Sequence, residues 1–186
     1  MIYQTIQGRD VPALGLGTWR LAGDACREGV AHALDVGYRH IDTAQGYDNE
    51  AEVGDALHAS AVDRGDIFLT TKLWIGDLSP EDVRRAAEES LRRLRTDYVD
   101  LLLIHWPTQD MDLPGALDAM RALQDEGKVR HLGVSNFTPS LLRRALRHAP
   151  LFCNQVEYHP FLGQDRLREM ARRHDLLLTA YSPIAQ

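Results

Sequence analysis

The stretch Tyr-Val-Asp-Leu-Leu-Leu-Ile at positions 98–104 decides the fold, together with Leu-Leu-Leu-Thr-Ala-Tyr at positions 176–181. Each stretch is short and almost continuously apolar. A strand that is buried on both faces has this composition, which is typical of a parallel sheet covered by helices. The two stretches therefore predict a parallel α/β protein.

Five further stretches resemble strands, and segments with helical patterning separate them. The seven predicted strands cover positions 14–17, 40–42, 67–72, 99–105, 129–135, 152–157 and 176–181. Strands that alternate with helices leave two architectures, an open doubly wound sheet and a (β/α)8 barrel. The run Gly-Leu-Gly-Thr-Trp-Arg at positions 15–20 fails the dinucleotide fingerprint of the open sheet, because Arg20 stands where the third glycine is needed. The barrel is therefore the favoured fold.

The predicted helix ends follow known capping preferences. Ser79 and Thr138 each precede a proline, which predicts helix starts after them. Asn49 with Glu52 three residues later predicts a third cap. Gly127 predicts the end of the helix before it.

The strand count falls one short of a complete barrel. A (β/α)8 barrel typically has ~250 residues, whereas this chain has 186 and ends after the seventh strand. We expect one domain, residues 1–186, built as a TIM barrel without its final helix–strand–helix. Its first and seventh strands would then expose unpaired edges. We also expect the natural protein to be longer, or a partner or self-association to fill the gap. Positions 2–6 and 11–12 predict an N-terminal β-hairpin that acts as a plug.

Composition excludes several classes of protein. The formal charge is −6 and the hydrophobic fraction is 44%, which disfavours nucleic-acid binding and disorder. No apolar run reaches the ~20 residues that a membrane span needs, and the N-terminus does not resemble a signal peptide. Cys26 and Cys153 form no CxxC pair, so we expect no disulfide and a cytoplasmic location. No ligand spacing predicts a catalytic metal.

Polar residues stand at the carboxyl ends of consecutive predicted strands, where barrel enzymes carry their chemistry. Asp42, Lys72 and His105 end the second, third and fourth strands, and Tyr47 follows closely after the first of them. Alone, each has a structural explanation as a cap, a surface lysine, a core histidine or a loop aromatic. Together they indicate a catalytic site, because clustered ionisable groups perturb one another's pKa values.

The chemistry of this set suits the reduction of a carbonyl group. A lysine held by an aspartate would lower the pKa of a nearby tyrosine from about 10, which makes the tyrosine a proton donor near neutral pH. A neutral histidine would donate a hydrogen bond to the same carbonyl oxygen. Hydride transfer then requires a nicotinamide cofactor. Three alternatives stay open: an isomerase or lyase with Lys72 as a Schiff-base nucleophile, a non-enzymatic binding module, and a catalytically inactive fragment.

Six motifs, in order along the whole chain, resemble motifs of the aldo-keto reductase family. Within that family, the chain is most similar to the bacterial 2,5-diketo-gluconate reductase and methylglyoxal reductase branch. The motifs are Asp-Thr-Ala-Gln-Gly-Tyr-Asp-Asn-Glu (42–50), Thr-Thr-Lys-Leu-Trp (70–74), Leu-Ile-His-Trp-Pro (103–107), Gly-Val-Ser-Asn-Phe (133–137), Asn-Gln-Val-Glu-Tyr-His-Pro (154–160) and Ala-Tyr-Ser-Pro (180–183). The resemblance implies an NADPH-dependent oxidoreductase on a TIM barrel. Its substrates would be aldehydes and ketones, dicarbonyls and keto-sugars among them.

The resemblance also implies a role for each site residue. Asp42, Tyr47, Lys72 and His105 match the catalytic tetrad, with Tyr47 as the general acid. The match also implies cofactor contacts for five residues. Ser135, Asn136 and Gln155 would hold the nicotinamide carboxamide. Tyr181 would stack on the nicotinamide ring, and Ser182 would begin the loop along the pyrophosphate. Trp19, Trp74 and Trp106 would line the substrate pocket, with core packing as the alternative for each. The resemblance implies a monomer for the full-length protein, while the truncated chain would self-associate.

Overall fold

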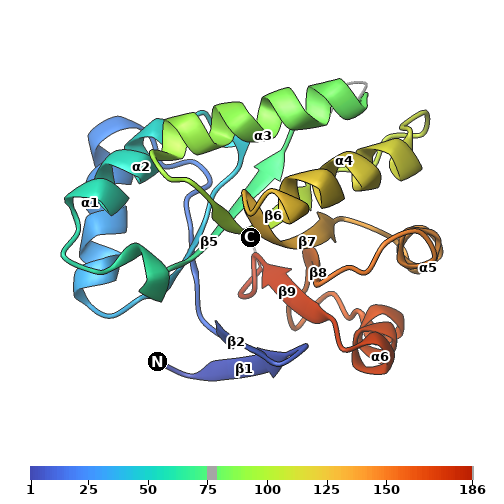
Figure 1. The fold of residues 1–186 in the computed structure, drawn as a ribbon. Coiled ribbons are helices and arrows are strands. Elements are labelled where there is room, and N and C mark those ends of the chain that lie inside the picture. The colour runs from blue at the N-terminus through green and yellow to red at the C-terminus, as the bar shows by residue number, and fades with distance from the viewer. Residues whose placement is uncertain (75–78, 186) are drawn as a thin grey trace.

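The computed structural model describes residues 1–74 and 79–185, and its centre is a sheet of parallel strands (Figure 1). The strands are β3 (Leu16–Gly17), β4 (His40–Asp42), β5 (Phe68–Leu73), β6 (Val99–Ile104), β7 (Val129–Ser135), β8 (Cys153–Glu157) and β9 (Leu177–Tyr181). They pair in the order of the sequence, from β3 to β9. All seven predicted strands are therefore confirmed, with ends that differ by two residues at most.

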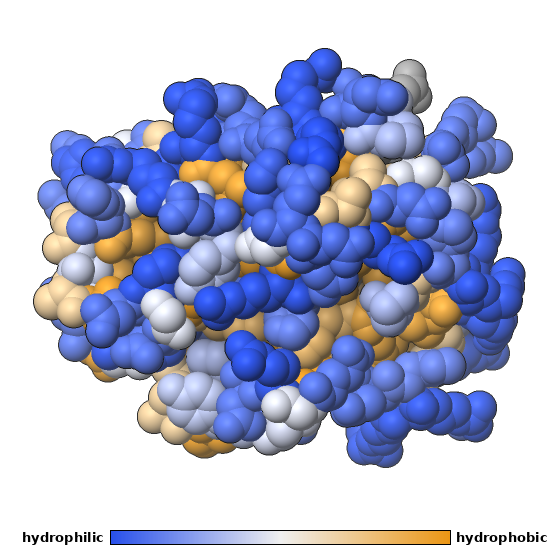
Figure 2. Space-filling view, viewed as in Figure 1, coloured by the Kyte–Doolittle hydropathy of each residue, from blue (hydrophilic) through white to orange (hydrophobic). Residues whose placement is uncertain are grey.

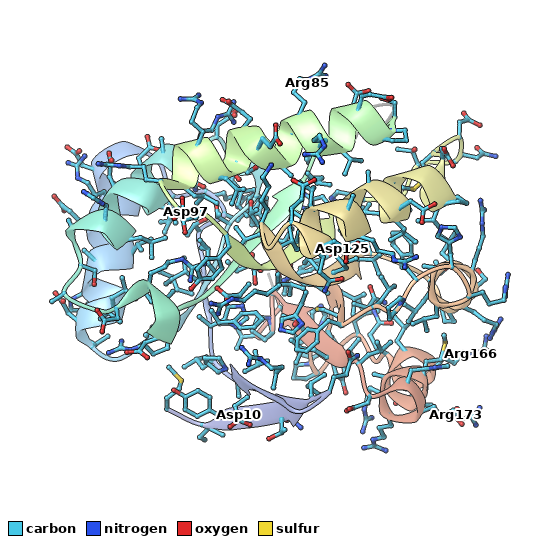
Figure 3. All side chains as sticks on the ribbon, in the orientation of Figure 1. Asp10, Arg85, Asp97, Asp125, Arg166 and Arg173 are labelled. Atoms are coloured by element: carbon cyan, nitrogen blue, oxygen red, sulfur yellow. The ribbon has the colours of Figure 1, made fainter. Side chains whose placement is uncertain are left out.

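A helix connects each strand to the next. The helices are α1 (Gly23–Asp35), α2 (Glu50–Ala59), α3 (Pro80–Leu94), α4 (Leu113–Asp125), α5 (Pro139–Leu146) and α6 (Asp165–His174), with short 3-10 helices η1 (Gln45–Tyr47) and η2 (Arg64–Asp66). Consecutive helices pack against one another around the outside of the sheet. Arg85 on α3 and Arg173 on α6 point away from the strands in Figure 3, and in Figure 2 hydrophobic residues show mainly in seams between hydrophilic ones. Within the described ranges, no helix is both long and apolar enough to cross a bilayer.

The core has two layers because side chains alternate across each strand. On β6, Leu102 and Ile104 pack outward against the helices, whereas Leu101 and Leu103 point into the barrel. The inner layer includes Ile6 and Val11 from an antiparallel hairpin of β1 (Tyr3–Ile6) and β2 (Arg9–Pro12). The predicted N-terminal hairpin is thus confirmed, and two of its side chains pack into the inner layer.

The barrel is open along one side. β3 and β9 are the two ends of the sheet within the described residues. β9 is half-buried along its whole length, whereas β5 and β6 are buried throughout. For the part of the chain that the structure describes, this arrangement confirms a TIM barrel of seven strands, in which β3 and β9 each pair with a strand on one side only.

Local signals predict the helix ends with one exception. Ser79 accepts a hydrogen bond of 3.2 Å from the backbone N–H of Asp82, and Thr138 caps α5 in the same way. Gly127 follows α4 with φ +77°, a conformation that favours glycine. Asn49 does precede α2, but the prediction that its side chain caps the helix is wrong. Its amide instead joins two neighbouring loops, as described below.

Candidate active site

The carboxyl ends of the strands gather polar side chains at one rim of the barrel. Asp42 is the last residue of β4, Lys72 is the penultimate residue of β5, and His105 directly follows β6. Ser135, Gln155 and Tyr181 stand at or near the ends of β7, β8 and β9. Parallel pairing places these ends side by side. Residues separated by more than a hundred positions therefore share one site.

Lys72 is the centre of the site and is completely buried. Its ammonium donates hydrogen bonds to Asp42 Oδ1, to the carbonyl oxygen of Thr43 at 2.9 Å and to the hydroxyl of Tyr47 at 3.2 Å. Burial disfavours the charged amine, but the charge of Asp42 and the contact with Tyr47 outweigh it, so the pKa of Lys72 is raised. The buried cation is thus held protonated beside a tyrosine hydroxyl.

Tyr47 lies in η1, on the loop that follows β4. Asn49 fixes this loop: its amide nitrogen donates to the carbonyl oxygens of Thr18 at 2.8 Å and Leu21 at 2.9 Å, and its oxygen accepts from Thr43 at 2.7 Å. These bonds explain why the side chain does not cap α2. They also hold the tyrosine against the lysine.

The net pKa shift of Tyr47 differs from the prediction. Burial raises the pKa of Tyr47, and this effect exceeds the lowering by Lys72. The predicted net lowering of the Tyr47 pKa is therefore wrong. The physical reason is that the phenol lies in a poorly solvated corner, where an anion is disfavoured. Lys72 still acts in the predicted direction.

His105 forms the wall next to Tyr47. The ring centroids of these two residues lie 5.5 Å apart in an edge-to-face arrangement, and Trp74 meets His105 in the same way at 5.3 Å. Burial lowers the pKa of His105 to about 4, with a further lowering by Lys72. The imidazole is therefore neutral at physiological pH, as predicted.

Gln155 and its neighbours form the opposite wall. The Gln155 amide nitrogen donates to Asp42 Oδ2 at 2.7 Å. Asn136 donates to the carbonyl oxygen of His105 at 3.0 Å and accepts from the hydroxyl of Tyr181 at 2.9 Å. Ser135 donates to the carbonyl oxygen of Gln155 at 2.9 Å. Four of the five residues that the resemblance assigns to the cofactor, Ser135, Asn136, Gln155 and Tyr181, thus form one hydrogen-bond network that includes Asp42 and the backbone of His105.

These groups open into a cavity of about 780 Å³, which continues along the open side of the barrel. Trp19, Trp74 and Trp106 line it and are 49%, 56% and 49% exposed. Core packing is thereby excluded for all three. Ser182 also lines the cavity. Among the described residues, no group of three or more His, Cys, Asp or Glu side chains is arranged to hold a metal ion.

Three contributors to the site have no signal in the sequence. Thr43 acts through its backbone carbonyl, which no residue type encodes. The Gln45 side chain accepts from the backbone N–H of Trp74 at 2.9 Å and donates to Ala86 and Ser90 on α3. Gly46 lies under the indole of Trp74. Only the three-dimensional contacts identify these roles.

Comparison with known proteins agrees with this geometry. The sequence profile described as "Aldo/keto reductase family" matches residues 13–186. The methylglyoxal reductase DkgB of Escherichia coli O157:H7 is 42% identical over 180 residues, which cover 94% of this chain and 67% of that protein.

Two solved structures share the fold. A putative 2,5-diketo-D-gluconic acid reductase B superposes with a TM-score of 0.93 at 44% identity, covering 97% of this chain and 66% of the other. An aldo-keto reductase from Bombyx mori in complex with NADP superposes with a TM-score of 0.91 at 31% identity, covering 98% and 66%.

The chain thus spans about two thirds of the length of these relatives. The profile match covers most of the chain, and the relatives exceed 30% identity. The chain therefore belongs to the aldo/keto reductase family, whose members are NADP-dependent oxidoreductases.

Proposed function

We propose that the protein reduces small aldehydes and ketones, dicarbonyls among them, with NADPH and with Tyr47 as the proton donor. One observation carries the proposal. The Tyr47 hydroxyl lies 3.2 Å from the ammonium of a completely buried lysine, in the same cavity as a neutral His105. The similarity to a methylglyoxal reductase supports dicarbonyls as substrates.

The residues of the opposite wall fit a nicotinamide. Its carboxamide has both donors and an acceptor, and Ser135, Asn136 and Gln155 offer hydroxyl and amide groups at that wall. Tyr181 offers a ring for stacking, and Ser182 follows it at the rim. The NADP complex of the Bombyx mori relative supports the choice of NADP(H). When bound, the reduced nicotinamide supplies the hydride for the carbonyl carbon.

The chain's own residues then handle the carbonyl oxygen. His105 is neutral, so it donates a hydrogen bond to that oxygen without competing for its proton. Tyr47 gives its hydroxyl proton to the oxygen as negative charge develops there. The Lys72 cation stabilises the resulting tyrosinate across the 3.2 Å contact, and Asp42 keeps Lys72 charged and in place.

The alternatives make different demands on the same residues. A Schiff-base nucleophile needs a neutral amine with a depressed pKa, whereas the pKa of Lys72 is raised by Asp42 and Tyr47 despite burial. This disfavours an isomerase or lyase. A binding module or an inactive fragment would have no use for the Tyr47 proton, so the Tyr47→Phe variant separates both from the reductase.

The test is NADPH consumption with methylglyoxal, in the wild type beside Tyr47→Phe, together with titration of NADPH binding by fluorescence. We expect turnover in the wild type, a loss of at least a hundredfold in the variant, and equal NADPH affinity in both. Equal turnover in both proteins would refute Tyr47 as the acid. NADPH binding without turnover in either protein would favour the binding module or the inactive fragment.

We also propose a reducing compartment, the cytoplasm, as its place of action. Both cysteines, Cys26 and Cys153, are free and buried, and burial raises their pKa values to about 11 and about 12. Thiols that stay protonated react slowly. Non-reducing mass spectrometry of the protein from cells should find both thiols free, and a disulfide would argue against this location.

A further inference from the structure

Gly46 has a contact that its backbone conformation does not explain. Its φ is not in the positive region that favours glycine. A Cβ atom at this position would instead lie 2.4 Å from Cε3 of Trp74 and 2.9 Å from both Cδ2 and Cζ3. The six-membered ring of the indole therefore rests directly on the glycine. Any side chain at position 46 would have to displace it.

The position of Trp74 matters because the indole faces the proposed carbonyl-binding corner. Its ring meets His105 edge to face at 5.3 Å, and Tyr47 directly follows the glycine in η1. The Trp74 backbone is held by Gln45, which is in turn bonded to α3. With its backbone fixed, the indole can yield to a new side chain only by rotating. Being 56% exposed, it has room to do so.

We infer that Gly46 is a specificity-determining residue, which seats Trp74 as a flat wall beside the reacting carbonyl and thereby favours planar, conjugated carbonyl compounds. This inference rests on the proposed function. Flat π-systems stack on an indole, and such contacts contribute about 0.5–1.5 kcal/mol beyond buried area, a factor of roughly 2 to 13. Aryl aldehydes and vicinal dicarbonyls are flat next to the carbonyl group, whereas puckered or branched aliphatic aldehydes are not.

The test compares benzaldehyde with cyclohexanecarbaldehyde, which have similar size but differ in planarity. We expect the kcat/KM of the wild type to be about three- to tenfold higher for benzaldehyde. We expect the same preference in the Kd values, measured by ligand-observed NMR without added cofactor. Gly46→Ala should reduce this preference at least threefold. Gly65→Ala is the control, since a Cβ there would meet nothing within 4 Å.

A second variant makes the test specific to the contact. Trp74→Ala should abolish the preference, and Gly46→Ala should have no further effect in that background, because its only action is on the indole. The inference would be overturned if Gly46→Ala left the preference for benzaldehyde unchanged. It would also be overturned if Gly46→Ala changed this preference equally in the wild type and in the Trp74→Ala background. Kd ratios that follow the expected pattern without turnover in any variant would refute the proposed reductase and leave the inference about Gly46 standing.

Discussion

The side-chain amide of Gln155 on β8 reaches across the barrel interior and donates a 2.7 Å hydrogen bond to Asp42 on β4. The other carboxylate oxygen of Asp42 accepts from Lys72. One carboxylate therefore joins the proposed cofactor wall to Lys72, which in turn contacts the proposed acid, Tyr47. With its nitrogen used in this way, the Gln155 oxygen remains as the acceptor for a carboxamide N–H.

Gln155→Met tests this connection, because methionine matches the shape of glutamine without its polar atoms. We expect the free energy of unfolding to fall by about 1–3 kcal/mol, since one oxygen of a mostly buried carboxylate loses its partner. NADPH affinity should fall as well. Urea unfolding measures the first effect and fluorescence titration the second. Gln109→Met, at an exposed position, is the control and should change neither. Unaltered stability in Gln155→Met would show that the bond contributes nothing.

The Lys72–Asp42 pair leads to a prediction about unpaired buried charge. Lys72→Met leaves Asp42, whose side chain is 15% exposed, without its cation. Breaking a buried pair typically costs about 3–5 kcal/mol, whereas replacing both partners is far less costly. We therefore expect Lys72→Met to be strongly destabilised and Lys72→Met with Asp42→Leu to recover most of the loss without turnover. Denaturant midpoints and NADPH assays measure the two quantities. A double variant as unstable as the single one would contradict this account.

How far the sequence predicts this site depends on the range of each interaction. The strands and the caps at Ser79 and Thr138 follow from apolar runs and from residues three positions apart, so they can be predicted. The Gln155–Asp42 bond joins residues 113 positions apart, and no local pattern encodes it. At Asn49, a long-range contact replaces a local one. The residue type predicts a helix cap, but its side-chain amide donates to the carbonyl oxygens of Thr18 and Leu21 instead. The direction of the Tyr47 pKa shift cannot be predicted from local sequence, because the burial that raises this pKa is a property of the whole fold.

The lowered pKa values of three histidines predict an acid-sensitive fold. Burial lowers the pKa of His105 to about 4, and it also lowers the pKa values of His40 and His131. Between pH 6.5 and pH 4 the unfolded chain therefore binds more protons at these positions than the folded chain. The stability that they contribute is complete above pH 6.5 and is lost as the pH falls, with a slope of at most about 1.4 kcal/mol per pH unit for each histidine.

His105→Asn isolates one of these contributions. Urea unfolding between pH 4.5 and 7.5 should give a shallower dependence on pH for the variant than for the wild type, because asparagine does not titrate. His58→Asn is a matched control at an exposed position on α2 and should keep the slope of the wild type. Equal slopes in wild type and His105→Asn would show that His105 titrates alike in the folded and unfolded chain.

Gly54 and Gly29 give a prediction in which structure and helix propensity disagree. Both lie inside helices, Gly54 in α2 and Gly29 in α1. Alanine is favoured over glycine in a helix by about 1 kcal/mol, so propensity alone predicts stabilisation at both positions. A Cβ at Gly29 would meet only Leu21, at an ordinary 3.8 Å. A Cβ at Gly54 would lie 2.4 Å from the carbonyl oxygen of Arg93, which belongs to the backbone of α3.

Because backbone cannot rotate away as a side chain can, Gly54→Ala must push α2 from α3. We expect Gly29→Ala to raise the free energy of unfolding by up to about 1 kcal/mol and Gly54→Ala to lower it by about 1–3 kcal/mol, both measured by urea unfolding. The displacement would also reach the site, since Gln45 is bonded to α3 and η1 immediately precedes α2. Gly54→Ala should therefore weaken turnover as well as stability. Equal stabilisation by both substitutions would mean that the close approach of α2 to α3 does not exist in solution.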